Sequence, residues 1–221
     1  MSTRARITLK SAVWAIALSP LILLLHRFLT DGLGANPISY VTNLLGDTTL
    51  RLLLASLALT PLRIALGISW QMGLRRLLGL FAFFYACLHF TVWIAVDHFF
   101  EWAELISDIV ERPYITVGML ALTLLIPLAA TSTSGMIQRL GGKNWRRLHR
   151  LVYLIGLLGV LHYLWLVKKG VNDPYLYAAI LAVLLGVRLW DWARRQAWFG
   201  VLAWLRGGYS PIRTAGDMRR N

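Results

Sequence analysis

The sequence contains one cysteine, Cys87, and few charged residues. A single cysteine excludes an intrachain disulfide and a cysteine-rich metal site. Charged residues make up 15% of the 221 positions and hydrophobic residues 57%, whereas soluble domains are about a quarter charged. No G-x-G-x-x-G segment follows a strand-like run, which argues against a nucleotide-binding domain in this chain. No small-residue cleavage site follows the first apolar block, so we expect no removable signal peptide.

The apolar residues that are present fall into six long blocks, and a membrane-spanning helix needs about 20 such residues. Turn-forming segments such as NDP (172–174) separate the blocks. The sequence therefore predicts an all-α membrane protein, with a six-helix transmembrane domain over residues 1–195 and a basic cytoplasmic tail over residues 196–221. We expect that the spans contain no acidic residue. We also expect the residues after Gly207 to be disordered. The six predicted spans cover residues 11–29, 50–66, 77–96, 114–130, 148–167 and 175–192.

The basic residues are distributed unevenly between the two sides of the predicted bundle. Eighteen of the 23 lysine and arginine residues fall on the side that holds both termini, so the positive-inside rule predicts that both termini are cytoplasmic. The net charge of +13 does not indicate nucleic-acid binding, because the basic residues lie between apolar blocks. On the other side, residues 97–112 hold five of the ten acidic residues. This loop is either simply solvated or a docking surface for a partner protein.

Two of the five histidines, His89 and His162, lie well inside predicted spans. At about 1.5 Å per residue, both lie roughly 18–20 Å from the cytoplasmic boundary. Ionisable residues at such depth are unfavourable and are candidates for function. Because the third and fifth spans run in the same direction, the two imidazoles could bind one haem iron from opposite sides. Several neighbours are expected to make room for a flat macrocycle: Gly156 and Gly159 before His162, and Phe83, Phe84, Tyr85 and Trp93 around His89.

The sequence argues against two other interpretations of this histidine pair. A proton relay would need Asp or Glu in the membrane core, where we expect none, and a zinc site would need three or four close ligands, whereas only two histidines share this depth. A haem-free transporter or scaffold, in which both histidines only pack helices, is an alternative from another functional class.

His149 lies about 20 Å from His162 along the same predicted helix, at the cytoplasmic edge. A partner at that depth on the third span is missing, because Arg75 and Arg76 occupy the corresponding positions. His149 could bond a loop, serve as an alternative haem ligand, or form one wall of a cytoplasm-side redox site. The arginines nearby, which include Arg146, could bind a lipid phosphate or the phosphate of a flavin.

Several segments, taken together and in order, resemble the MsrQ (formerly YedZ) family. These proteins are haem-binding membrane subunits of the bacterial periplasmic methionine-sulfoxide reductase system, within the ferric-reductase-like transmembrane group that includes NADPH oxidases. The resemblance covers about residues 9–195 and implies a b-type haem held by His89 and His162, with His149 as a third implicated position, and FMN. The segments are GLGANP (32–37), RRLLGL (75–80), LHF (88–90), RPYITVG (112–118), TSTSGMIQRLGGKNWRRLHRLVY (131–153) and HYLW (162–165).

The resemblance also implies a place in electron transfer. The protein would lie in the bacterial inner membrane and take electrons from the quinone pool or a cytosolic flavin reductase. It would pass them to the periplasmic molybdopterin subunit MsrP, which reduces methionine sulfoxide in oxidised proteins. We expect no such chemistry in this chain, because Cys87 lies in a span and cannot ligate a molybdopterin outside it. The missing second histidine on the third span favours one haem plus another carrier. A stand-alone ferric reductase or another b-type cytochrome is the alternative.

Overall fold

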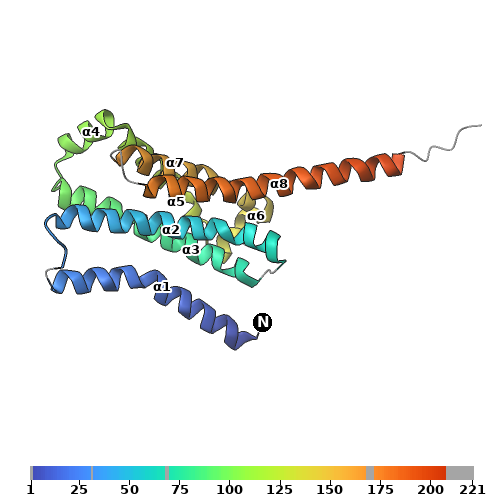
Figure 1. Ribbon diagram of the computed structural model, residues 1–221, viewed down its shortest axis with the longest axis horizontal. Coiled ribbons are helices and arrows are strands. Elements are labelled where there is room, and N and C mark those ends of the chain that lie inside the picture. Colours follow the sequence, from blue (N-terminus) through green and yellow to red (C-terminus); the bar gives the residue numbers. More distant parts are fainter. Residues whose placement is uncertain (1, 31, 68–69, 168–171, 208–221) are drawn as a thin grey trace, which may run out of the picture.

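The computed structural model describes residues 2–30, 32–67, 70–167 and 172–207, and every regular element in these ranges is helical (Figure 1). The predicted all-α class is therefore confirmed for these residues, while the predicted disorder after Gly207 concerns residues outside them. The elements are α1 (Thr3–Leu29), α2 (Pro37–Leu66), η1 (Trp70–Leu74), α3 (Arg75–Val92), η2 (Trp93–Asp97, a π-helical segment), α4 (Trp102–Glu111), α5 (Pro113–Ala130), α6 (Ser134–Leu148), α7 (Leu151–Leu166) and α8 (Asp173–Gly207).

Among the described residues, five helical segments are long and apolar enough to cross a membrane: α1, α2, α3 together with η2, α5, and α8 as far as Gln196. The helices α6 and α7 meet at 45° and add a sixth crossing if they form one bent span. The chain is thus a multi-pass membrane protein. The N-terminus and the far end of α8 point toward the same end of the bundle (Figure 1), which we call the terminal end, and α4 marks the opposite end. Helix α8 continues past residue 196, the predicted start of the tail, to Gly207.

Helix α2 begins earlier than predicted. The side chain of Asn36 accepts a hydrogen bond from the Ser39 amide at 3.1 Å, and Pro37 occupies the first turn. Both features favour a helix start. The predicted start at residue 50 is therefore wrong, and Asp47 lies inside the helix. The expectation that no acidic residue enters a span is also wrong, because the polar residues of α2 face a cavity rather than lipid.

The bundle core is formed by two antiparallel pairs, α2 with α3 and α5 with α7. Buried leucines and small residues fill the space between the pairs. A Cβ on Gly156 would lie 3.3 Å from Leu57, and one on Gly159 would lie 3.5 Å from Leu50. Both glycines therefore accommodate leucines of α2, and Gly159 also lines the cavity that α2 faces, so their role in making room for a macrocycle stays a prediction.

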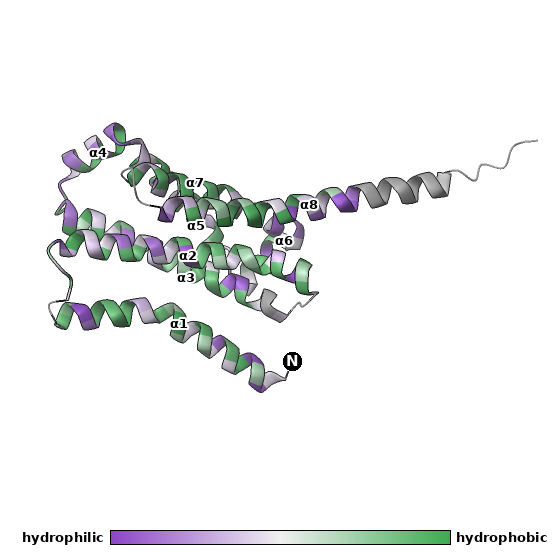
Figure 2. Cartoon of the chain, viewed as in Figure 1, coloured by the Kyte–Doolittle hydropathy of each residue, from purple (hydrophilic) through white to green (hydrophobic). Residues whose placement is uncertain are grey.

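Helix α1 lies at the edge of the bundle and shows hydrophobic residues along much of its length (Figure 2). Its contacts are few but specific. The Tyr85 hydroxyl donates to the Ala17 carbonyl at 2.6 Å, and Trp14 packs edge-on against Phe81. Tyr85 therefore anchors α1. The sequence had predicted that it flanks His89.

Candidate functional site

The two intramembrane histidines face each other across the bundle. The ring centroids of His89 on α3 and His162 on α7 are 6.3 Å apart, and the ring planes are inclined by 84°. This separation accommodates a single metal ion bound to both rings, given metal–nitrogen bonds of about 2.0 Å. The structure thus brings together the two residues that the sequence placed at one depth.

A backbone carbonyl fixes the orientation of each ring. The Nδ1 atom of His89 lies 2.9 Å from the Thr42 carbonyl oxygen, and Nδ1 of His162 lies 2.7 Å from the Tyr114 carbonyl oxygen. A carbonyl oxygen can only accept, so each Nδ1 carries the hydrogen and donates. In a neutral imidazole the other nitrogen, Nε2, then has a free lone pair. Metal-binding histidines are commonly oriented in this way.

A glycine makes room for each ring. A Cβ on Gly46 would lie 3.2 Å from the His89 ring, and a Cβ on Gly118 would lie 2.8 Å from Nδ1 of His162. Real Cβ atoms do not approach other atoms as closely as 2.8 Å. Each histidine therefore lies in a notch beside a glycine of the neighbouring helix, and the notch at Gly118 is too tight for any Cβ unless the ring shifts.

The two notches follow one pattern that sequence reasoning missed. On both α2 and α5, the residue whose carbonyl accepts from the histidine stands four positions before the glycine. Each glycine precedes its histidine by nearly the same distance along the chain, Gly46 to His89 and Gly118 to His162. This repeated glycine-to-histidine spacing was the available signal.

A cavity of about 340 Å³ surrounds the pair, a size within the range of roughly 300–1,000 Å³ typical of cofactor pockets. Both histidines and both notch glycines line it, and Trp93 and Phe90 are the aromatic residues from the third span that do so. Of the residues predicted to flank a macrocycle near His89, only Trp93 is among the lining residues. The apolar lining residues include Leu50, Leu53, Ala86, Met119, Leu122, Leu125, Ile155 and Leu166, and α2 adds the polar residues Ser39, Thr42, Asn43, Asp47 and Thr49.

Asp47 introduces a carboxylate into this mostly apolar cavity. It follows Gly46, so it lies at the level of the histidine pair. Arg51 lies 3.4 Å from the carboxylate and donates through Nε to the Tyr177 hydroxyl at 2.7 Å. Tyr163, which follows His162, also lines the cavity. A charge is therefore present beside the pair, and it is partly neutralised by Arg51.

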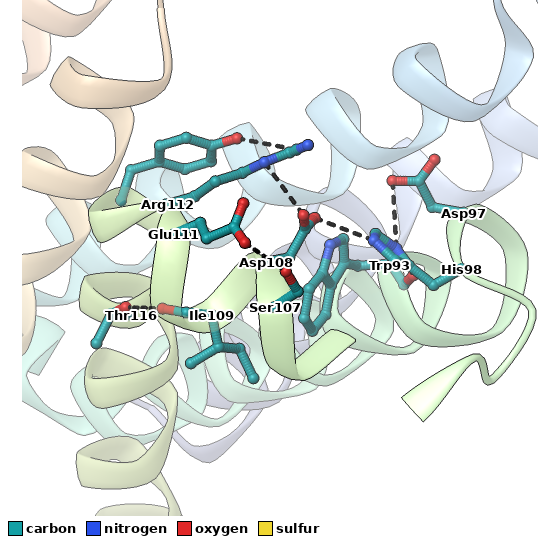
Figure 3. Close-up of polar contacts among 10 residues, drawn as sticks. Trp93, Asp97, His98, Ser107, Asp108, Ile109, Glu111, Arg112 and Thr116 are labelled. Atoms are coloured by element: carbon teal, nitrogen blue, oxygen red, sulfur yellow. Dashed lines mark hydrogen bonds and ion pairs between the residues drawn. The ribbon is translucent and has the colours of Figure 1, made fainter. Parts of the chain in front are cut away.

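A network of charged residues stands at the α4 end of the cavity (Figure 3). Arg112 and Asp97 line the cavity there. Arg112 pairs with Asp108 at 3.2 Å, and Asp108 lies 3.0 Å from Nε2 of His98. The hydrogen bond to the Tyr114 hydroxyl and the charge of Asp108 raise the pKa of Arg112 above its ordinary value, so Arg112 stays cationic. Charged residues thus lie at the α4 end of the cavity, in addition to Asp47 beside the histidine pair.

His149 does not line this cavity. It lies between α6 and α7, where its Nε2 is 3.1 Å from the Thr131 hydroxyl and its ring stacks on Trp145 at 3.9 Å. Trp145 in turn donates to the Thr131 carbonyl. This arrangement matches the interpretation in which His149 bonds a loop, and the structure does not bring it to the histidine pair.

Comparisons with known proteins agree with this architecture. The family model "Ferric reductase like transmembrane component" matches residues 45–160. The chain is 54% identical to a protein of Herminiimonas arsenicoxydans, over 85% of this chain and 88% of that protein. It is 50% identical to a protein of Ralstonia nicotianae, over 91% and 92% of the two chains, and 52% identical to one of Rhodospirillum rubrum, over 84% and 89%. All three are named protein-methionine-sulfoxide reductase heme-binding subunit MsrQ.

Proposed function

Since the chain belongs to the MsrQ family of ferric-reductase-like membrane proteins, we propose that it is an electron-transfer subunit that binds one b-type haem between His89 and His162. The observation that carries the proposal is the facing pair of imidazoles, each donating through Nδ1 to a carbonyl and each with a free Nε2. The names of the relatives, which state heme binding, support it. When bound, haem supplies a reversible one-electron iron couple.

The residues of the chain have distinct roles in this proposal. His89 and His162 hold the iron, and the Thr42 and Tyr114 carbonyls fix their ring orientation. The notches at Gly46 and Gly118 let the two rings lie flush with the neighbouring helices. The apolar part of the lining would keep water away from a bound haem, and Arg112 would offer a cation to the carboxylates of that haem at the α4 end of the cavity.

The direction of electron flow follows from the charge distribution. Most basic residues lie at the terminal end, so we place that end in the cytoplasm and the α4 end in the periplasm of a bacterial inner membrane. The histidine pair lies toward the α4 end, because Tyr114 belongs to the first turn of α5. Electrons would thus leave toward a periplasmic acceptor. We propose that this acceptor is the molybdopterin subunit MsrP, and that it repairs oxidised methionine in periplasmic proteins.

The donor is proposed to be the quinone pool or a cytosolic flavin reductase. Among the described residues the cavity contains one histidine pair, which suits one haem and a second carrier nearer the cytoplasm. We propose FMN as that carrier. The basic residues around His149, which include Arg75 and Arg146, suit its phosphate.

An absorption spectrum of the purified protein tests the proposal. We expect a low-spin b-type spectrum after growth with ample haem precursor. Anaerobic addition of a quinol analogue, or of a flavin reductase with NADH, should then reduce the haem bands. A colourless protein would overturn the haem assignment, and a coloured protein that neither donor reduces would overturn the proposed donors.

A further inference from the structure

Helix α4 is held against the bundle by one face. Leu105 is 3% exposed, and Asp108 contacts both His98 and Arg112 (Figure 3). These contacts come from the segment before α4 and the residue after it, so they fix the rotation of the helix about its own axis. Apart from Leu105, Asp108 and Ile109, the residues of α4 are exposed.

The exposed surface of α4 is divided into an apolar and an acidic stripe. Trp102, Ile106 and Val110 recur at every fourth position, and they are 64%, 62% and 76% exposed. Glu104 and Glu111 form the other stripe with Ser107, whose hydroxyl donates to Glu111 at 2.7 Å. At about 100° per residue, the acidic stripe is centred roughly 130° from the apolar one. The helix therefore has three sides: protein, apolar and acidic.

The turn before α4 extends the apolar stripe. Phe99 and Phe100 are exposed, and both have positive φ angles, 45° and 62°. Left-handed conformations of bulky residues are unfavourable by about 1–2 kcal/mol each. Two backbone bonds hold the turn, from Phe100 N to the Ile94 carbonyl and from Glu101 N to the His98 carbonyl. The fold thus maintains a strained turn that leaves two aromatic side chains outside the protein.

The spans before and after α4 also carry exposed apolar residues. Val96, at the end of the third span, is exposed three residues before Phe99. Pro113 starts the next span two residues after the last residue of α4. Leu120 and Ile126 of α5 are also exposed. Water-exposed apolar patches of this kind are unfavourable, and tryptophan is enriched at the lipid–water boundary.

We infer that α4 lies in the lipid–water interface at its end of the bundle, with Phe99, Phe100, Trp102, Ile106 and Val110 inserted among lipids. The acidic stripe then faces water and is the part of α4 left accessible to a soluble partner. Amphipathic interfacial helices usually carry Lys and Arg that attract anionic lipid, whereas the polar face of α4 is acidic. Its insertion therefore depends on apolar burial and does not need anionic lipid.

Nitroxide labels on the full-length protein in phosphatidylcholine nanodiscs test this inference. Cys87→Ala provides the background, and Ile106→Cys and Glu104→Cys are the matched label sites on the two stripes. Oxygen concentrates in lipid and a nickel chelate stays in water. We expect the ratio of oxygen to nickel accessibility to be several-fold higher at position 106 than at position 104.

Two outcomes would overturn the inference. Nickel access at position 106 equal to that at position 104 would place the stripe in water, free for a soluble protein. Protection of position 106 from both reagents would place it against protein, such as a second copy of this chain. If either variant fails to fold, Val110→Cys and Ser107→Cys repeat the comparison on the same two stripes.

Discussion

The helix pairs α2–α3 and α5–α7 each pack a histidine ring against a glycine, but the residues around the two rings differ. In each, a histidine ring rests on a glycine and donates to the carbonyl four residues before it. The residue after the glycine differs: α2 has Asp47, and α5 has Met119. The clearance differs too, since a Cβ on Gly46 would be 3.2 Å from its ring and a Cβ on Gly118 would be 2.8 Å away. The notch geometry is thus shared, while charge and tightness distinguish the two sides.

Removal of either histidine should have the largest effect. We expect His89→Ala and His162→Ala each to lose nearly all bound haem, because one imidazole remains in a cavity that offers no second nitrogen ligand among its lining residues. The pyridine haemochrome content per protein measures this loss. Full occupancy in either variant would show that the two helix pairs do not share one iron.

The glycine notches provide the next test. Gly118→Ala should displace the His162 ring and lower haem occupancy several-fold, and Gly46→Ala should have a smaller effect because its ring is farther from the added methyl. Overpacking of this kind destabilises by about 1–3 kcal/mol. Gly186→Ala on α8 is the matched control, since its Cβ would meet nothing within 4 Å. Equal occupancy in all three variants would contradict the notch argument.

The spans and the depth of the histidines could be predicted from the sequence, whereas the start of α2 could not, and the reasons are physical. Long apolar runs predicted the spans near α3, α5 and α7 because hydrocarbon imposes a minimum length on any crossing helix. Depth along parallel helices predicted that His89 and His162 meet, because helical rise is constant. The start of α2 was missed because Asn43 and Asp47 interrupt the apolar run, and only tertiary packing shows that they face a cavity.

The glycines illustrate the same limit. Gly156 and Gly159 precede His162 on its own helix; each accommodates a leucine of α2, Leu57 or Leu50, although Gly159 also lines the cavity. The glycines that do contact the rings lie on the helices opposite. Sequence proximity could not identify them, because a histidine side chain that points away from its own helix packs against a residue of a different helix.

The charge difference between the two pairs predicts a change in reduction potential. Asp47→Asn should raise the midpoint potential of the haem by tens of millivolts, because a nearby carboxylate favours the oxidised iron in a low-dielectric cavity. A spectroscopic redox titration measures the shift. Glu104→Gln on α4, which removes a carboxylate that does not line the cavity, is the control. A lowered potential, or equal shifts in both variants, would contradict the assignment of Asp47 to the haem environment.

His149 should behave unlike the paired histidines and produce the smallest change. His149→Ala removes one hydrogen bond to Thr131 and the stacking on Trp145, which together stabilise the fold by about 1–2 kcal/mol. We expect a lower melting temperature with unchanged haem content, and Thr131→Val should lower it by a similar amount. His149 connects the end of α5 to the start of α7 and does not line the cavity. Its loss should therefore lower the stability of the helix packing and leave both notches in place. Haem loss in His149→Ala with normal occupancy in Thr131→Val would instead make His149 a ligand, and the single-site arrangement would fail.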